Sequence, residues 1–317
     1  MLNEYDSERV SVSPRLGILA VLRIPLHSHP DMTHLWLFPI VTLTALASCA
    51  SPGTSRHRPT VDALRTSLSF CATFDDGLDA DLARGDGRLF AAPGYEQQSQ
   101  AEPGVGGADV ERAADVGRRG AALDFRTRNR RALFYQAKGN VPTNGGSLAS
   151  TFAFWLKLDP DVDLEPGFCD PIQVTDKRYD NGAVWVDFTK DDNPRHFRLG
   201  VFGDAESWNP TGVMPSDNPV FRSRLVALEE HPFSREAWHQ VTITVDTIEG
   251  FGRLYIDGEP MGTTSKIEES FTWDMERAAI RIGLSYVGLF DELLVFDRPL
   301  TPAEVKTLHR MAPADLL

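Results

Sequence analysis

Residues 150–158 of the chain read STFAFWLKL, and this stretch decides the fold class. Phe152, Phe154 and Leu156 recur at every second position, so an extended strand places all three side chains on one face. Gly, Asp, Asn and Pro separate further short runs of strand character. These runs lie at 68–74, 121–125, 132–134, 183–188, 196–201, 238–245, 252–256, 279–283 and 289–296.

Two local signals sharpen this interpretation. Asp257-Gly258, between 252–256 and 261–264, is typical of a tight β-hairpin turn. Thr301, followed by Pro302 and Glu304, forms a capping box and predicts one short C-terminal helix. We therefore expect an all-β protein, an antiparallel two-sheet β-sandwich of the jelly-roll type with a short C-terminal helix. The predicted core positions are Phe152, Phe154, Val241, Ile243, Leu254, Ile256, Leu293 and Val295.

Composition limits the function classes. The chain has 317 residues, of which 42% are hydrophobic, which suffices for a packed core. Its formal net charge of -13 disfavours a nucleic-acid partner, because phosphate backbones repel an acidic chain. Only 3 cysteines are present, too few for a disulfide scaffold.

The N-terminus carries an export signal. Residues 35–47, LWLFPIVTLTALA, are too short to span a bilayer, which needs about 20 residues, but are typical of a signal-peptide core. The following LASC at 46–49 resembles the lipobox of bacterial lipoproteins, which implies that Cys49 is lipidated. The alternatives are a plain signal peptide with a chance cysteine, or a buried strand. Translation begins at Met1 or Met32, and residues 1–31 are expected to be an over-extended start or a disordered leader.

These boundaries divide the chain into four parts. Residues 1–48 are expected to form a leader and signal peptide, and 49–67 a tether rich at its start in Ser, Pro and basic residues. The sandwich domain is expected over 68–310, with 311–317 as a tail. Within the domain, 94–107 and 204–219 are expected to be surface loops.

Four motifs carry a family resemblance. They are FDDG at 74–77, STFAFWL at 150–156, WHQVT at 238–242 followed by GRLYIDG at 252–258, and GLFDEL at 288–293 followed by FDRPLTPAEV at 296–305. In this order they resemble the laminin G-like, concanavalin A-like lectin-glucanase jelly-roll superfamily, in its bacterial branch. The resemblance implies the same sandwich fold for residues 68–310.

The resemblance also implies a possible metal site. Many relatives bind one Ca²⁺ at the sandwich edge, and Asp75 and Asp291 match the opening and closing positions. Oxygen donors of this kind suit Ca²⁺. The alternative is that Asp291 accepts backbone N–H groups and fixes the turn without a metal. Ca²⁺ is the only cofactor that the sequence suggests.

Two tryptophans are candidate ligand-binding residues. Trp185 is out of phase with Val184 and Val186, so it is expected on the outer face of its sheet, and Trp208 lies in a predicted loop. Exposed indoles stack on sugars or anchor protein partners. The alternative is that both rings are lids over the edge of the core.

Cys71 and Cys169 remain once Cys49 is lipidated. Cys71 belongs to the first predicted strand, and Cys169 is expected on a loop. In an oxidising compartment two remaining cysteines favour a disulfide, although an unpaired arrangement stays open.

The sequence favours a non-catalytic role. Glucanases on this fold carry carboxylates on one face of a strand, and no such pattern occurs, because adjacent Asp291 and Glu292 point to opposite faces. We therefore expect a binding module for a glycan or for an envelope or extracellular protein. It would be displayed at the cell envelope, periplasmic or on the outer-membrane surface, with membrane contact only through its lipid anchor. The alternatives are a divergent polysaccharide-degrading enzyme and a structural envelope protein.

Overall fold

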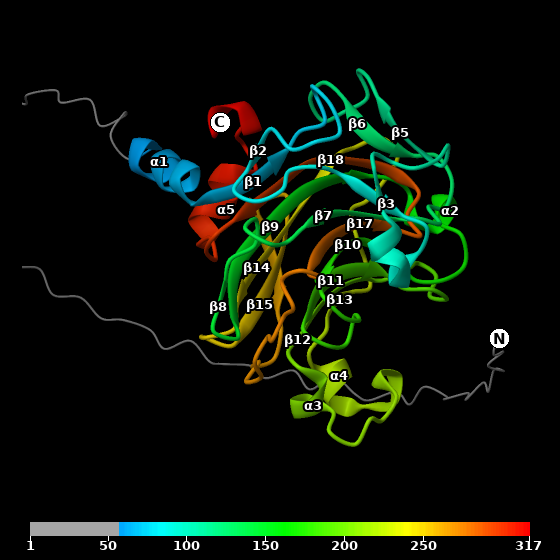
Figure 1. The fold of residues 1–317 in the computed structure, drawn as a ribbon, viewed down its shortest axis with the longest axis vertical. Helices are drawn as coiled ribbons and strands as arrows, with labels where there is room; N and C mark the ends of the chain where they lie inside the picture. The colour runs from blue at the N-terminus through cyan, green and yellow to red at the C-terminus, as the bar shows by residue number, and fades with distance from the viewer. Residues whose placement is uncertain (1–56) are drawn as a thin grey trace, which may run out of the picture. The chain divides into compact units, whose positions relative to one another are not determined.

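The computed structural model describes residues 57–317, which form two antiparallel sheets packed face to face (Figure 1). The expected fold class, an antiparallel β-sandwich with a short C-terminal helix, is confirmed. The predicted leader 1–48, which includes the apolar run 35–47, lies outside the described residues, and so does Cys49. No helix within 57–317 has the length and apolar character needed to cross a membrane.

The larger sheet has ten strands, in which the main order is β16-β15-β14-β9-β18-β1-β2. β18 thus pairs with β9 on one side and with β1 on the other. The strands are β1 (Leu68–Ala72), β2 (Leu82–Ala83), β5 (Val110–Ala113), β6 (Ala122–Phe125), β8 (Thr143–Asn144), β9 (Ser147–Lys157), β14 (His239–Asp246), β15 (Phe251–Ile256), β16 (Glu259–Thr263) and β18 (Gly288–Phe296).

The smaller sheet has eight strands in the order β13-β12-β11-β10-β17-β7-β3-β4. They are β3 (Phe90–Ala92), β4 (Glu102–Pro103), β7 (Ala132–Gln136), β10 (Cys169–Thr175), β11 (Ala183–Phe188), β12 (Phe197–Phe202), β13 (Val226–Leu228) and β17 (Ala279–Leu284). Residue Cys169, expected on a loop, instead begins β10. Pro171 lies where the register of β10 and β11 shifts, so the strand tolerates a residue that cannot donate a ladder hydrogen bond.

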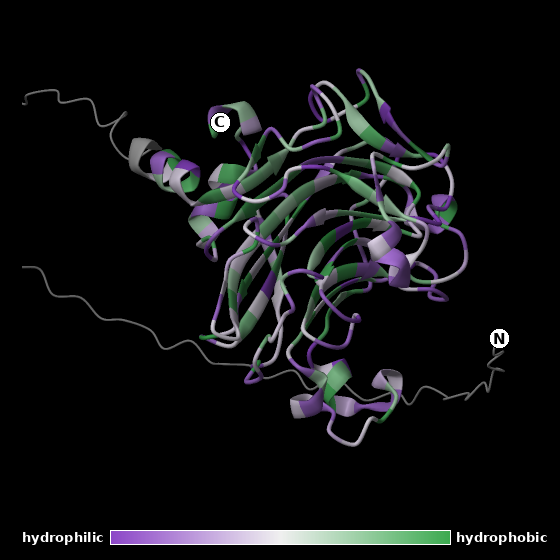
Figure 2. Ribbon diagram, in the orientation of Figure 1, coloured by the Kyte–Doolittle hydropathy of each residue, from purple (hydrophilic) through white to green (hydrophobic). Residues whose placement is uncertain are grey.

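The main core lies between the sheets, and the predicted strand phase is confirmed. All eight predicted core positions belong to this cluster and are at most 2% exposed. Hydrophobic positions follow the strands of both sheets, whereas hydrophilic positions gather in the connections (Figure 2). The predicted hairpin turn is also present: Asp257 and Gly258 have φ of 53° and 82° and join β15 to β16.

Helices cover the outer face of the ten-stranded sheet. Helix α5 (Pro302–Leu308) begins with the predicted capping box, in which Thr301 and Glu304 bond each other's backbone N–H groups. Helix α1 (His57–Ser67) and the turn η3 (Pro313–Asp315) pack beside it in a second apolar cluster.

Two predicted boundaries are therefore wrong. Residues 57–67, expected to belong to a tether, form α1, whose Leu64 is fully buried. The predicted tail 311–317 packs through Leu316, which is 1% exposed. The outer face of the ten-stranded sheet carries apolar side chains here, and Leu64 and Leu316 cover them. Burial of this apolar surface stabilises both segments.

The remaining short helices lie at the other sheet. They are η1 (Tyr95–Gln100), α2 (Pro160–Asp163), α3 (Ala205–Trp208), η2 (Pro215–Asp217) and α4 (Pro219–Ser223). The first of these lies within the predicted loop 94–107, and α3 and η2 lie within 204–219. In Figure 1, η1 follows β3, whereas α3 and α4 lie together beyond β12.

Candidate functional site

The outer face of the eight-stranded sheet is the polar face of the sandwich. On β11, Val184 and Val186 point into the main core, so Trp185 and Asp187 point outward. By the same alternation, β10 presents Gln173 and β17 presents Arg281 on this face. Gln173, Asp187 and Arg281 are at most 4% exposed, so they form a polar floor beneath the segments that cover this face.

Tyr95, from η1, closes over this floor. Its Oη lies 2.5 Å from Gln173 Oε1 and 2.8 Å from the carbonyl oxygen of Lys177. The guanidinium of Arg281 lies 4.3 Å from the centre of its ring. Burial raises the pKa of the Tyr95 hydroxyl to about 12, so it stays a neutral donor at physiological pH. These contacts fix the ring against the sheet.

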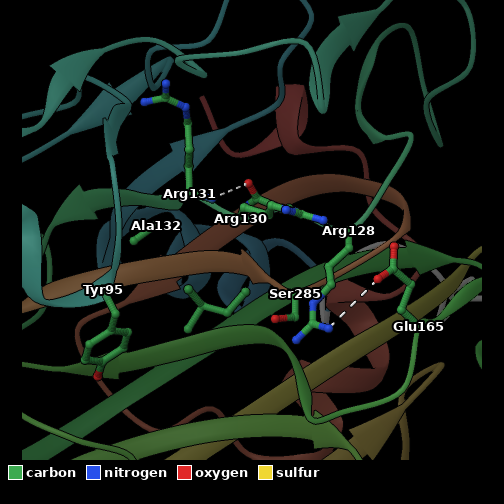
Figure 3. Close-up of a pocket in the computed structure, with 9 residues that line it drawn as sticks. Tyr95, Arg128, Arg130, Arg131, Ala132, Glu165 and Ser285 are labelled. Carbon is green, nitrogen blue, oxygen red and sulfur yellow. Dashed lines mark hydrogen bonds and ion pairs between the residues drawn. The ribbon is translucent and has the colours of Figure 1, made fainter. Parts of the chain in front are cut away.

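A cavity of about 440 Å³ opens on one side of Tyr95 (Figure 3). Three arginines from the connection between β6 and β7 line it, Arg128, Arg130 and Arg131, and Glu165 supplies the carboxylate among the lining residues. We call this cavity the arginine pocket. Its volume is that of a typical small-ligand site.

Asn129 holds the arginine-rich connection in place. It is 4% exposed, its Nδ2 donates to the carbonyl oxygen of Gly283 at 3.0 Å, and its Oδ1 accepts from the backbone N–H of Arg131 at 3.0 Å. The backbone is thus anchored while the neighbouring arginine side chains remain at the surface.

A second cavity of about 440 Å³ lies on the other side of Tyr95. Its lining mixes charges of both signs: Lys177, Arg277 and Arg281 face Glu96, Asp176 and Glu276. The two cavities share the ring of Tyr95. The outer face of the sheet therefore has a basic compartment and a charge-balanced compartment.

Two carboxylates lie beside each other on β10 and β11. Gln173 Nε2 donates to Asp170 Oδ2 at 2.7 Å, and Arg198 Nε donates to Asp187 Oδ1 at 2.8 Å. Burial raises the pKa of both carboxyls, and the proximity of Asp187 adds to the rise at Asp170. Phe168, which is 51% exposed, covers the Arg198 guanidinium at 5.5 Å. Asp170 and Asp187 therefore take part in a network of hydrogen bonds within the sheet.

The predicted ligand-binding tryptophans are buried. Trp185 does point outward from its sheet, as its phase predicts, but it is 2% exposed, and Trp208 is 6% exposed. Phe221 from α4 packs with both rings, and Gly200 lets Trp185 lie close to β12, where a Cβ would come within 2.2 Å of the indole. The expectation of exposed stacking surfaces is wrong, and the alternative of apolar lids describes both residues.

The predicted metal residues lie near each other, Asp291 on the interior strand β18 of the ten-stranded sheet and Asp75 shortly after β1. The connection 117–121 joins them: Arg118 N–H donates to Asp291 Oδ2 at 2.6 Å, and Ala121 N–H donates to Asp75 Oδ1 at 2.9 Å. Asp291 also accepts the N–H of Glu292 at 2.7 Å. We call Asp75, Asp291 and Glu292 the carboxylate cluster.

Arginines supply the positive charge in the carboxylate cluster. Arg119 Nη1 lies 2.9 Å from Glu292 Oε1, and Arg112 donates to the carbonyl oxygens of Phe74 and Asp75. Over the part of the chain that the structure describes, no three His, Cys, Asp or Glu side chains group as metal ligands. N–H groups already bond both oxygens of Asp291, and Arg119 pairs with Glu292, so a Ca²⁺ ion would have to displace these donors. Calcium binding stays a prediction that a metal titration would test.

The predicted disulfide is not formed. Cys71 and Cys169 are both buried free thiols. Cys71 packs in the cluster under α1 and α5, whereas Cys169 lies in the core between the sheets. Burial raises the pKa of both thiols, so they remain protonated.

Two antiparallel sheets packed face to face define a β-sandwich. The family model of the Concanavalin A-like lectin/glucanases superfamily matches residues 136–306, and the chain belongs to this superfamily. Neither Tyr95 nor the arginine-rich connection lies in the matched range. A search of curated protein sequences finds no match.

Solved structures are similar to the chain at low identity. Domain 4 of AbnA, a GH43 extracellular arabinanase from Geobacillus stearothermophilus in complex with arabinotriose, has 16% identity and a TM-score of 0.48, with 77% of this chain and 98% of that domain covered. A mutant of HCR/D has 10% identity and a TM-score of 0.50, with 78% of this chain and 52% of that chain covered. The chain thus spans about half the length of HCR/D, and the likeness concerns the fold alone.

Proposed function

We propose that the chain is a non-catalytic glycan-binding module whose ligand lies on the outer face of the eight-stranded sheet, on either side of Tyr95. The observation that carries this proposal is the pair of cavities that share one fixed aromatic ring. A sugar offers an apolar ring face for stacking and hydroxyls for hydrogen bonds, and the cavities offer the matching groups. A lectin and glucanase superfamily fold supports the same class of ligand.

Binding to a glycan array, followed by titration calorimetry, tests this proposal. The wild-type chain should bind at least one glycan, and Tyr95→Ala should weaken binding at least about tenfold, because the shared ring is removed. Tyr179→Ala is the matched control, since Tyr179 is a 41% exposed tyrosine that lines neither cavity. Thermal unfolding checks that both variants fold. Absence of any glycan ligand, or equal losses in the two variants, would overturn the proposal.

The alternative of a polysaccharide-degrading enzyme draws on Asp170 and Asp187. They lie on the same sheet face, and both have raised pKa values, as a general acid requires. Their bonds to Gln173 and Arg198 favour instead a role in holding the strands. Release of reducing ends from a polysaccharide panel, abolished by Asp170→Asn, would establish the enzyme.

We also propose that the module is exported and lipid-anchored through Cys49. This rests on the signal-like run 35–47 and the LASC sequence at 46–49. Mass spectrometry of the mature chain should show an acylated N-terminal cysteine, and Cys49→Ala should abolish acylation. An unmodified N-terminus at another residue would refute the anchor while leaving the glycan site untouched.

A further inference from the structure

The arginine pocket is basic in an acidic chain. The formal net charge is -13, yet the connection at 126–131 reads RTRNRR. Three of its arginines line the cavity together with one carboxylate, Glu165. Positive charge gathered in a concave site of an otherwise acidic protein selects for negative ligands at that site.

Part of this charge has no internal partner. Arg126 pairs with Glu111 at 2.9 Å, outside the cavity, and Arg128 lies 3.9 Å from Glu165 at the limit of an ion pair. Within residues 57–317, Arg130 and Arg131 take part in no ion pair, and Arg130 is exposed. In Figure 3 the side chain of Arg130 extends toward Arg128, whereas that of Arg131 extends away from the other lining side chains.

The backbone that carries these arginines is preorganised. Buried Asn129 ties it to the carbonyl oxygen of Gly283 and to the N–H of Arg131, as described above. Ser285, on the facing turn after β17, adds a hydroxyl to the lining. A fixed backbone reduces the ordering cost of binding, so the guanidinium groups need to settle only their own rotamers.

Guanidinium chemistry identifies the ligand class. The planar fork of arginine binds carboxylate and sulfate through two parallel hydrogen bonds, which a sugar hydroxyl cannot offer. Tyr95, Ala132 and Leu284 add apolar surface beside the arginines. We propose that the arginine pocket selects an acidic saccharide and that Arg128 and Arg130 hold its carboxylate or sulfate. This inference rests on the proposed glycan-binding function and specifies its ligand.

Titration calorimetry with four polysaccharides at physiological salt tests the inference. At this ionic strength the Debye length is about 8 Å, so the pocket is screened from acidic groups farther away on the surface. Polygalacturonate offers carboxylates, dextran sulfate offers sulfates, and dextran and arabinan are neutral. The wild-type chain should bind one of the acidic polymers at least about tenfold more tightly than either neutral polymer. Which acidic polymer binds identifies the oxyanion.

The variants Arg128→Gln and Arg130→Gln should each weaken binding of the acidic polymer at least about fivefold, with a smaller dependence on salt. Arg310→Gln is the matched control, because Arg310 is exposed and lines neither cavity. It should bind as the wild type does.

The outcomes separate this inference from the proposed function. Tight binding of dextran or arabinan that is indifferent to both arginine variants would overturn the acidic specificity and leave the glycan module standing. Binding of no polysaccharide at all would overturn both. Equal losses in Arg130→Gln and Arg310→Gln, or tighter binding of a single-stranded oligonucleotide than of any polysaccharide, would also overturn the inference.

Discussion

The arginine pocket and the carboxylate cluster use the same two side-chain types in opposite ways. In the carboxylate cluster Asp291 is 0% exposed and Glu292 3% exposed, and each carboxylate has donors supplied by the connection 117–121. In the arginine pocket Arg130 lines a cavity and pairs with no carboxylate among the described residues.

This difference shows what separates a structural charge cluster from a binding site. A buried charge requires partners inside the protein, because desolvation without them is costly. A charge beside a cavity keeps its water until a ligand replaces it. Charge in the carboxylate cluster should therefore affect stability, and charge in the arginine pocket should affect binding.

The largest expected effect is on the pH dependence of stability. Burial, reinforced by Glu292, raises the pKa of Asp291 from 3.8 to about 8. The folded state thus holds this proton more tightly than the unfolded chain does. The stabilisation that comes from binding this proton is fully present below about pH 4. It is lost as the pH rises through 8, and the free energy of unfolding then falls by several kcal/mol in total. Asp291→Asn should flatten the wild-type decline, as measured by urea unfolding from pH 4.5 to 8.5.

Glu304 provides a comparison of opposite sign. The hydrogen bond from Arg298 lowers the pKa of Glu304 from 4.5 to about 2, so its contribution is present above pH 4.5 and is lost as the pH falls. Glu304→Gln should therefore leave the slope between pH 5 and 8 unchanged. Equal slopes for the wild type and Asp291→Asn would show that Asp291 is ionised in the folded state.

A glycine tests the close fit of the carboxylate cluster. Gly120 has φ of 56°, and an added Cβ would meet Asp75 Oδ1 at 2.1 Å. Gly120→Ala should cost about 3 kcal/mol of unfolding free energy, from backbone strain and overlap together. Gly145 has nearly the same φ, 57°, with nothing within 4 Å of the added Cβ, so Gly145→Ala should cost only about 1 kcal/mol. Similar losses in both variants would argue against a tight Asp75 contact.

The ion pair of the carboxylate cluster should have a smaller effect. Arg119→Gln leaves Glu292 without its charged partner, and we expect a loss of about 2 kcal/mol. Lys306→Gln breaks the pair between Lys306 and Glu259, whose side chains are 48% and 56% exposed, and should change stability by less than about 0.5 kcal/mol. Chemical denaturation measures both, and a neutral Arg119→Gln would remove the distinction between buried and exposed pairs.

The smallest expected effect on stability is in the arginine pocket. Arg130→Gln should change the unfolding free energy by less than about 0.5 kcal/mol, because an exposed arginine without an ion pair loses few contacts. A loss above about 1 kcal/mol would make Arg130 a structural residue and weaken the comparison.

Local signals in the sequence were sufficient for much of the fold. Alternation fixed the phase of Phe152 and Phe154, Asp257-Gly258 marked a hairpin, and Thr301 with Glu304 marked a helix start. Each depends on neighbours within a few residues. Strand β10 was missed because Pro171 and polar Gln173 interrupt its apolar pattern, and its position in the middle of a sheet follows only from pairing with β11 and β17.

The candidate site was less accessible to sequence reasoning. The phase of Trp185 was correct, but its covering by Phe221 depends on a distant segment. Tyr95 lies in a stretch expected to be a loop, and its partner Gln173 is far along the chain. The run RTRNRR at 126–131 was visible as a basic segment in an acidic chain and offered the one local signal of the arginine pocket.

The position of β18 has a consequence for how the chain is made. Synthesis delivers residues from the N-terminus onward, but β18, the last of the described strands, lies between β9 and β1. Until residues 288–296 emerge, β1 and β9 each present an open edge, and the ten-stranded sheet cannot close. The ten-stranded sheet is therefore completed only after residues 288–296 have left the ribosome, and the strands made earlier must wait for the last one.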